Sequence, residues 1–193
     1  LMKNIHINLA SQIPEDLPGP VIFIAMAETA IGLGQGVFEA HHSAHPNNPS
    51  LFLHTSRYHV GDMPIFEFQE AHSHAPRQFL HIPQNSDLKK LLLSARSLVL
   101  IDDEASTGNT FLNLTSACRE FIPSIERVHL VTITNFMGQA ATESLSRRFG
   151  ITVSISATLN GEYTFTAGDL KTPKCKAQLF KAHTDRGANS SFG

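Results

Sequence analysis

The 193-residue chain has no tryptophan, only two cysteines and no long hydrophobic run. Cys118 and Cys175 lie far apart and belong to no CxxC pair, which argues against a disulfide scaffold and a cysteine zinc site and fits a reducing cytoplasm. The longest apolar run, Val21–Ala27, is far too short to span a bilayer, and the first residues show no signal-peptide pattern. We therefore expect a cytoplasmic protein without a membrane partner.

An excess of charge of either sign is also missing. The chain carries 15 Lys and Arg against 17 Asp and Glu, a net charge of −2. No general polyanion-binding surface follows from this balance, so nucleic acid is not an expected partner, and any bound anion must meet a local site. With 41% hydrophobic and 17% charged residues the chain is of globular composition, and its length suits one domain, with or without an appendage.

Short apolar strands alternate with helical segments along most of the chain. Helices are expected from Glu28 to about Ala44, over Asp87–Ser94 with Ser86 as N-cap, up to about Phe121, and over Gly138–Phe149. The apolar runs between them indicate core strands: Val21–Met26, Leu51–Thr55, Ser97–Ile101, Val128–Thr134 and Ile151–Ala157. This alternation predicts an α/β fold with a mainly parallel five-stranded sheet flanked by helices.

Smaller strands are expected outside this core. Lys3–Leu9 alternates apolar and polar residues, as a half-exposed strand does, and Ile65–Phe68 and Phe79–Ile82 are short strand-like pieces. Asn160-Gly161, within Thr158–Ala167, is typical of a β-hairpin turn. The domain is expected to comprise residues 1–168, with a core of about residues 21–157. The polar residues 169–193 are typical of either a loose terminus or a linker to a further domain.

Leu98–Thr110, LVLIDDEASTGNT, carries the strongest chemical pattern of the chain. An apolar strand runs into Asp102 and Asp103, small and hydroxylated residues follow, and a helix then begins. Ligands of open parallel sheets bind at the carboxyl ends of strands, and a helix N-terminus there offers N–H groups that suit a phosphate. The paired carboxylates can accept hydrogen bonds from a neighbouring diol such as ribose. The alternative is a surface Asp pair that caps a helix.

This segment resembles the fingerprint of the type I phosphoribosyltransferase family, which consists of four apolar strand residues, two acids and a small-residue loop ending Thr-Gly-x-Thr. The resemblance implies that Asp102 and Asp103 hold the ribose hydroxyls of phosphoribosyl pyrophosphate, and Mg²⁺ through the ligand or through water. It also implies that the Thr158–Ala167 hairpin forms a small hood over the acceptor. The 5-phosphate would be held by a loop with hydroxyl donors and a close backbone: Ala105, Ser106, Thr107, Gly108, Asn109 and Thr110.

A second segment, Ala27-Glu28-Thr29, follows the first buried strand. Members of the family use this loop to hold pyrophosphate through backbone amides, often with an unusual peptide geometry, so the resemblance assigns these three residues to substrate binding. Glu28 departs from the commoner Gly- or Lys/Arg-bearing loops. An acid beside pyrophosphate makes sense only if it faces magnesium waters or the substrate. The alternative is a helix N-terminus with Glu in its favourable first turn.

Arg57 stands at the end of the second strand, in the sequence HTSR. A guanidinium suits a bidentate contact with phosphate oxygens, so Arg57 is a candidate clamp on pyrophosphate. The alternative is a solvated arginine at a strand end.

Glu70–Arg77 falls between the second and third core strands, where type I enzymes carry a mobile loop that closes over pyrophosphate. The resemblance therefore makes His72, His74 and Arg77 candidate donors to the departing anion. His-x-His near Glu70 also fits part of a zinc site, although no third or fourth ligand has a defined spacing. Solvent-exposed loop histidines are the remaining alternative.

Together, these residues predict an enzyme that uses phosphoribosyl pyrophosphate and Mg²⁺ to transfer ribosyl 5-phosphate to a small base-like acceptor. The alternative is a non-catalytic regulator that binds phosphoribosyl pyrophosphate on the same fold. The acceptor is not identified, but Ser106 replaces an acid that assists the purine in hypoxanthine-guanine enzymes, which disfavours an oxopurine. The wording of the motifs also resembles the predicted phosphoribosyltransferases of bacterial tellurite-resistance and stress gene clusters. A homodimer is the family expectation.

Overall fold

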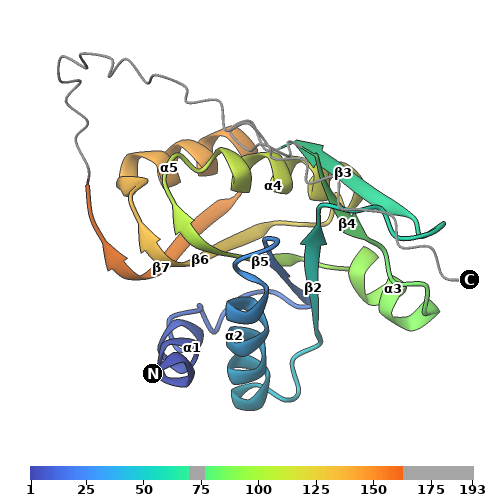
Figure 1. Ribbon diagram of the computed structural model, residues 1–193, viewed down its shortest axis with the longest axis horizontal. Coiled ribbons are helices and arrows are strands. Elements are labelled where there is room, and N and C mark those ends of the chain that lie inside the picture. Colours follow the sequence, from blue (N-terminus) through green and yellow to red (C-terminus); the bar gives the residue numbers. More distant parts are fainter. Residues whose placement is uncertain (70–76, 163–193) are drawn as a thin grey trace, which may run out of the picture. The chain divides into compact units, whose positions relative to one another are not determined.

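A seven-stranded sheet of order β3-β4-β2-β1-β5-β6-β7 runs through the centre of the structure, a computed structural model that describes residues 1–69 and 77–162 (Figure 1). Its strands are β1 Val21–Ala25, β2 Ser50–Ser56, β3 Ile65–Gln69, β4 Arg77–His81, β5 Ser97–Ala105, β6 Arg127–Asn135 and β7 Thr152–Asn160. The neighbours β2, β1, β5, β6 and β7 pair in parallel. β4 pairs antiparallel with both β2 and β3. The expected five-stranded sheet is therefore wrong in size, because the two strand-like pieces before α3 join its edge and make it mixed.

Helices cover both faces of the sheet, with α1 and α2 on one side and α4 and α5 on the other (Figure 1). The helices are α1 Met2–Ala10, α2 Ile31–Ala44, α3 Ser86–Leu93, α4 Asn109–Phe121 and α5 Gly138–Phe149. Alternation along β1 explains the two layers: Ile22 and Ile24 join one apolar cluster, and Val21 and Phe23 join the other. A strand that is apolar on both faces requires a helix on each, as the sequence predicted.

The first segment of the chain is a helix, not the strand expected over Lys3–Leu9. The apolar positions Ile5, Ile7 and Leu9 fit a strand, but Ile7 is 50% exposed whereas Leu9 is fully buried with Ile5 packed against its cluster. The buried pair is spaced i, i+4, which is the spacing of one helix face. The segment fits both the alternating pattern of a strand and the i, i+4 pattern of a helix. Packing against α2 and the face of the sheet that α2 covers decides in favour of the helix.

A smaller correction concerns the start of α3. Asn85, not Ser86, is its N-cap, and the Asn85 side chain accepts hydrogen bonds from the backbone N–H groups of Asp87 and Leu88.

At the other end, β7 runs to Asn160, so most of the predicted Thr158–Ala167 hairpin and the domain boundary near residue 168 lie outside the described residues. Of the helices that the structure describes, none combines the length and the apolar character that a bilayer crossing needs.

Candidate active site

The two predicted ribose-binding acids lie on β5 itself. The strand does not end at Ile101 but continues to Ala105, and its pairing with β6 extends to Asn135. Asp102 is half-buried and Asp103 is exposed, and the Asp103 backbone N–H donates to Asp102 Oδ1 at 3.0 Å. The sequence placed the strand end too early because acids are depleted in strands; here they stand where the carboxyl end of the strand reaches solvent.

The loop after β5 turns directly into α4, as expected for a phosphate site. Gly108 has φ +77°, a left-handed conformation that favours glycine, and its carbonyl accepts the first helical hydrogen bond from Leu112 N–H at 2.9 Å. A Cβ at Gly108 would lie 2.6 Å from Met137 Cε, so a side chain there would have to displace the end of Met137. Ser106 and Thr107 are exposed, and the N-terminal turn of α4 follows at once. The N-terminal end of α4 thus follows, after a short loop, the strand that carries Asp102 and Asp103.

Not every residue of the predicted phosphate loop is open to a ligand. The Ala105 side chain is 2% exposed and belongs to the core, and its carbonyl accepts the Phe136 N–H at 2.7 Å. The Asn109 N–H lies 3.4 Å from Thr107 Oγ1. The candidates for a phosphate contact are therefore Ser106–Gly108 and the residues of the first α4 turn after Asn109.

The Ala27–Thr29 loop lies directly beside the acids. Met26 N–H donates to Ile101 O at 2.9 Å, so the loop starts in register with the residue before Asp102. Ala27 N–H donates at 2.7 Å to Oγ1 of Thr55, a fully buried residue of β2. The peptide between Ala27 and Glu28 is cis.

Two expectations about this loop change as a result. The Ala27 amide, predicted to hold pyrophosphate, is committed to Thr55, which leaves the amides of the exposed residues Glu28 and Thr29 as the candidates. The alternative of Glu28 as a first-turn helix acid is wrong, because α2 begins at Ile31 and its first turn carries no acid. Thr55 is a positioning residue that the sequence reasoning missed, although it lies in the HTSR segment that was singled out.

The two candidate arginines lie on different parts of the sheet. Arg57 is half-buried and directly follows β2, the strand next to β1. Arg77 is not in a loop: it begins β4, and its Nε pairs with Glu67 Oε1 at 3.0 Å with the side chain 70% exposed. The structure therefore gathers Arg57 with the acids and both loops along β2, β1 and β5, and leaves Arg77 one strand further out. His72, His74 and Glu70 lie outside the described residues.

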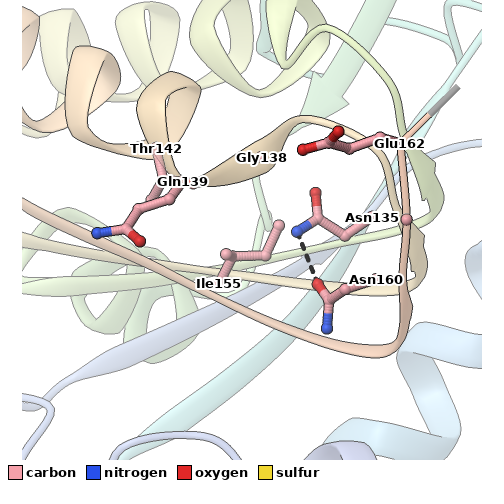
Figure 2. Close-up of a pocket in the computed structure, with 8 residues that line it drawn as sticks. Asn135, Gly138, Gln139, Thr142, Ile155, Asn160 and Glu162 are labelled. Atoms are coloured by element: carbon pink, nitrogen blue, oxygen red, sulfur yellow. Dashed lines mark hydrogen bonds between the residues drawn. The ribbon is translucent and has the colours of Figure 1, made fainter. Parts of the chain in front are cut away.

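A cavity of about 490 Å³ opens on the other side of β5, between the start of α5 and the carboxyl ends of β6 and β7 (Figure 2). The sequence reasoning did not find this cavity. Its lining includes a glycine at each end, Gly138 and Gly161, and otherwise Asn135, Gln139, Thr142, Ile155, Asn160 and Glu162. Because Asn135 pairs with Ala105 in the sheet register, the cavity begins one strand away from the phosphate loop.

The two asparagines of the cavity are held in one orientation. Asn135 Oδ1 accepts the Met137 N–H at 3.0 Å, and Asn135 Nδ2 donates to Asn160 Oδ1 at 2.9 Å (Figure 2). A backbone N–H can only donate, so it identifies the Asn135 oxygen, and this in turn identifies the Asn160 oxygen. The Asn160 amide therefore keeps its two N–H donors for another partner.

The acids fit magnesium better than a closed metal site. Within residues 1–69 and 77–162, no three His, Cys, Asp or Glu side chains gather as a metal-binding group. Mg²⁺ prefers oxygen donors and is commonly held by one or two carboxylates together with substrate phosphates and water. Asp102 and Asp103 supply that donor type at a solvent-facing strand end.

Similar folds are found among solved phosphoribosyltransferases. The adenine phosphoribosyl transferase of Trypanosoma brucei, in complex with AMP, pyrophosphate and ribose-5-phosphate, matches with a TM-score of 0.58 at 14% identity, over 93% of this chain and 73% of that one. The Leishmania tarentolae adenine phosphoribosyltransferase matches with 0.55 at 16%, over 82% and 70%. The Giardia lamblia enzyme with 9-deazaadenine matches with 0.53 at 12%, over 84% and 80%. At these identities the likeness shows the fold. No curated protein matches the chain.

The structure is thus an α/β protein with a strand–loop–helix junction, from β5 to α4, at the carboxyl edge of its sheet. The model of the family described as phosphoribosyl transferase matches residues 1–162. The chain belongs to this family and is a phosphoribosyltransferase enzyme.

Proposed function

We propose that the chain transfers ribosyl 5-phosphate from phosphoribosyl pyrophosphate to a nitrogen of a small base-like acceptor. The acceptor nitrogen forms a bond to C1 of the ribose, the bond from C1 to pyrophosphate oxygen breaks with its electron pair, and the acceptor loses a proton to solvent. The observation that carries this proposal is the alignment, on the adjacent strands β2, β1 and β5, of Arg57, the Glu28–Thr29 loop, the acid pair and the phosphate loop.

The acid pair and the phosphate loop hold the ribosyl half of the donor. Asp102 and Asp103 accept hydrogen bonds from the ribose hydroxyls and offset the positive charge that develops on the sugar. The N–H groups of Gly108 and of the first α4 turn hold the 5-phosphate, with hydroxyl donors from Ser106 and Thr107. Both groups come from one short segment, so they fix the distance between phosphate and ribose.

The Glu28–Thr29 loop and Arg57 lie on the side where pyrophosphate leaves. Thr55 holds the loop through Ala27, and the next amides and the Arg57 guanidinium stabilise charge on the departing anion. Arg77, His72 and His74 are proposed to add donors on this side; for Arg77 this requires exchange of its present partner, Glu67. Magnesium, when bound, supplies positive charge to the pyrophosphate and ribose oxygens, and Asp102 and Asp103 would hold it through the ligand or through water.

The acceptor is assigned to the cavity beside β6 and β7. This cavity opens at the carboxyl ends of strands next to β5, where an acceptor nitrogen can approach C1 from the side opposite the Glu28–Thr29 loop. A homodimer and a role in a tellurite-resistance or stress gene cluster stay predictions from the resemblance alone.

A direct test combines binding with turnover. Calorimetry with phosphoribosyl pyrophosphate and Mg²⁺ measures donor binding, and a pyrophosphate-release assay with a panel of bases measures transfer. Binding with base-dependent release is expected. Binding without release for any base would favour the regulator, and absence of binding would remove the proposed site.

A further inference from the structure

The described lining of the acceptor cavity carries one negatively charged side chain and no positively charged one. Of the described residues that line it, Glu162 alone is ionisable; the others are amides, a hydroxyl, two glycines and Ile155. Figure 2 shows the Glu162 carboxylate turned toward Gly138 and the start of α5. Among residues 1–69 and 77–162, no lysine, arginine or histidine lines the cavity.

Two kinds of neutral polar group also line the cavity: the oriented amides of Asn135 and Asn160, and the hydroxyl of Thr142. The orientation of Asn135 and Asn160 leaves the Asn160 amide nitrogen as a donor. The Thr142 residue is 9% exposed, and its Oγ1 is buried with no hydrogen-bond partner among the described residues. Because this oxygen is enclosed by protein atoms, a ligand could reach it only after the Thr142 side chain turns toward the cavity, and the hydrogen-bonding positions open to a ligand are those of Asn160 and Glu162.

These positions select one class of acceptor. Resting on the function proposed above, we propose that the acceptor is an uncharged nitrogen heterocycle with an amino group or ring N–H that donates to Glu162, and that carboxylate-bearing heterocycles are excluded. An N–H donor to a carboxylate forms a charge-assisted hydrogen bond. A second carboxylate within the same cavity would instead meet Glu162, and like charges at close range repel.

Steric fit alone would not make this distinction. A ring of purine or pyrimidine size enters a cavity of about 490 Å³ with or without a carboxylate. Discrimination must therefore come from charge and hydrogen bonding, and a single exposed residue two positions after β7, Glu162, carries most of it. Glu162 can be changed without disturbing buried packing, which makes the inference accessible to substitution.

The test is a pyrophosphate-release assay with two groups of bases, adenine, guanine and cytosine against orotate, nicotinate and quinolinate. The unmodified protein is expected to use a base of the first group only. Glu162→Gln should lower kcat/KM for that base about tenfold, with unchanged calorimetric affinity for phosphoribosyl pyrophosphate. Glu162→Lys should lower it further and raise the ratio of carboxylate-bearing to neutral base used. Glu15→Gln, the same change at an exposed loop residue far along the chain, is the matched control.

The outcomes separate this inference from the function on which it rests. Turnover of a carboxylate-bearing base by the unmodified protein would overturn the acceptor class and leave the transferase function standing. Equal kcat/KM for Glu162→Gln and Glu15→Gln would do the same. If no base of either group supports pyrophosphate release, the proposed function and the acceptor class both fail.

Discussion

On the β5–α4 side of the carboxyl edge, the candidate site is made largely of backbone, with a left-handed glycine and a helix N-terminus beside two acids. On the β6–β7 side it is made of side chains, with an oriented amide pair and one carboxylate. The first half depends on conformation and tolerates few added atoms. The second depends on which atoms the side chains present, so it can change its ligand without changing the fold.

The largest expected effect is the loss of folding stability at acidic pH, which concerns the sheet and helices that both halves share. His41 of α2 is 4% exposed, and burial, with smaller contributions from His45 and His42, lowers its pKa to about 4. His129 of β6 is 2% exposed, and burial, with smaller contributions from Arg127 and His41, likewise lowers its pKa to about 4. Both are neutral in the folded protein, whereas the unfolded chain takes up protons below its pKa of 6.5.

Stability is therefore present above pH 6.5 and is lost as the pH falls from 6.5 toward 4. The loss is on the order of 3 kcal/mol for each histidine. Denaturant unfolding at a series of pH values should show this slope, and His129→Gln should flatten it. His59→Gln, at an exposed histidine that is not among the neighbours acting on His41 or His129, is the control. An unchanged slope in His129→Gln would remove the buried neutral histidine as the cause.

The backbone half is tested at Gly108. Gly108→Ala is expected to lower the free energy of unfolding by about 2–3 kcal/mol and to abolish binding of phosphate-bearing ligands, because the residue needs a positive φ and its Cβ would displace Met137. Gly150→Ala is the matched control, since Gly150 has φ +62° with open space around it, and it should lose only about 1 kcal/mol. Urea unfolding and calorimetry measure both. Equal losses would show that the contact with Met137 is unimportant.

The acids provide the next largest effect. Asp103→Asn should lower the affinity for phosphoribosyl pyrophosphate by about 10–100-fold with little change in melting temperature, because a hydrogen bond to a charged group is lost at an exposed position. Glu104→Gln, the same kind of change at the next exposed residue, should leave affinity within about twofold. If the two variants bind alike, the ribose role belongs to neither Asp103 nor the pair.

The comparison also explains what the sequence could predict. The phosphate half lies within Leu98–Thr110, so strand, acids, glycine and helix start can be found by order alone, and the structure has them in that order. The cavity half joins Asn135 to Asn160 through strand register. Neither residue belongs to a motif, and no local pattern predicts that their amides meet.

The same distinction applies to the fold. The five parallel core strands were predictable because each shows an apolar run or, in β7, an alternation of apolar and polar residues between helical segments. α1 was not, because the spacing of Ile5 and Leu9 fits both a strand and a helix until α2 packs against it. Thr55 was missed as a support for Ala27 because a hydrogen bond across 28 positions of the chain leaves no local signal.

The smallest expected effect tests the amide pair. In Asn160→Asp, a carboxylate oxygen still accepts from Asn135 Nδ2, so the free energy of unfolding should change by less than about 0.5 kcal/mol. In Asn135→Asp, one oxygen still accepts from Met137 N–H, but the other faces Asn160 Oδ1, and the residue is only 7% exposed. Asn160 must then rotate its amide to donate, beside a newly buried charge, with an expected loss of about 1 kcal/mol.

Urea unfolding of both variants measures the difference, and calorimetry with phosphoribosyl pyrophosphate should find the backbone half unaffected in each. The asymmetry follows from the direction of the Met137 N–H alone: equal losses in the two variants would mean that the amides are not held in this orientation, and that Asn160 does not present its N–H donors to the acceptor.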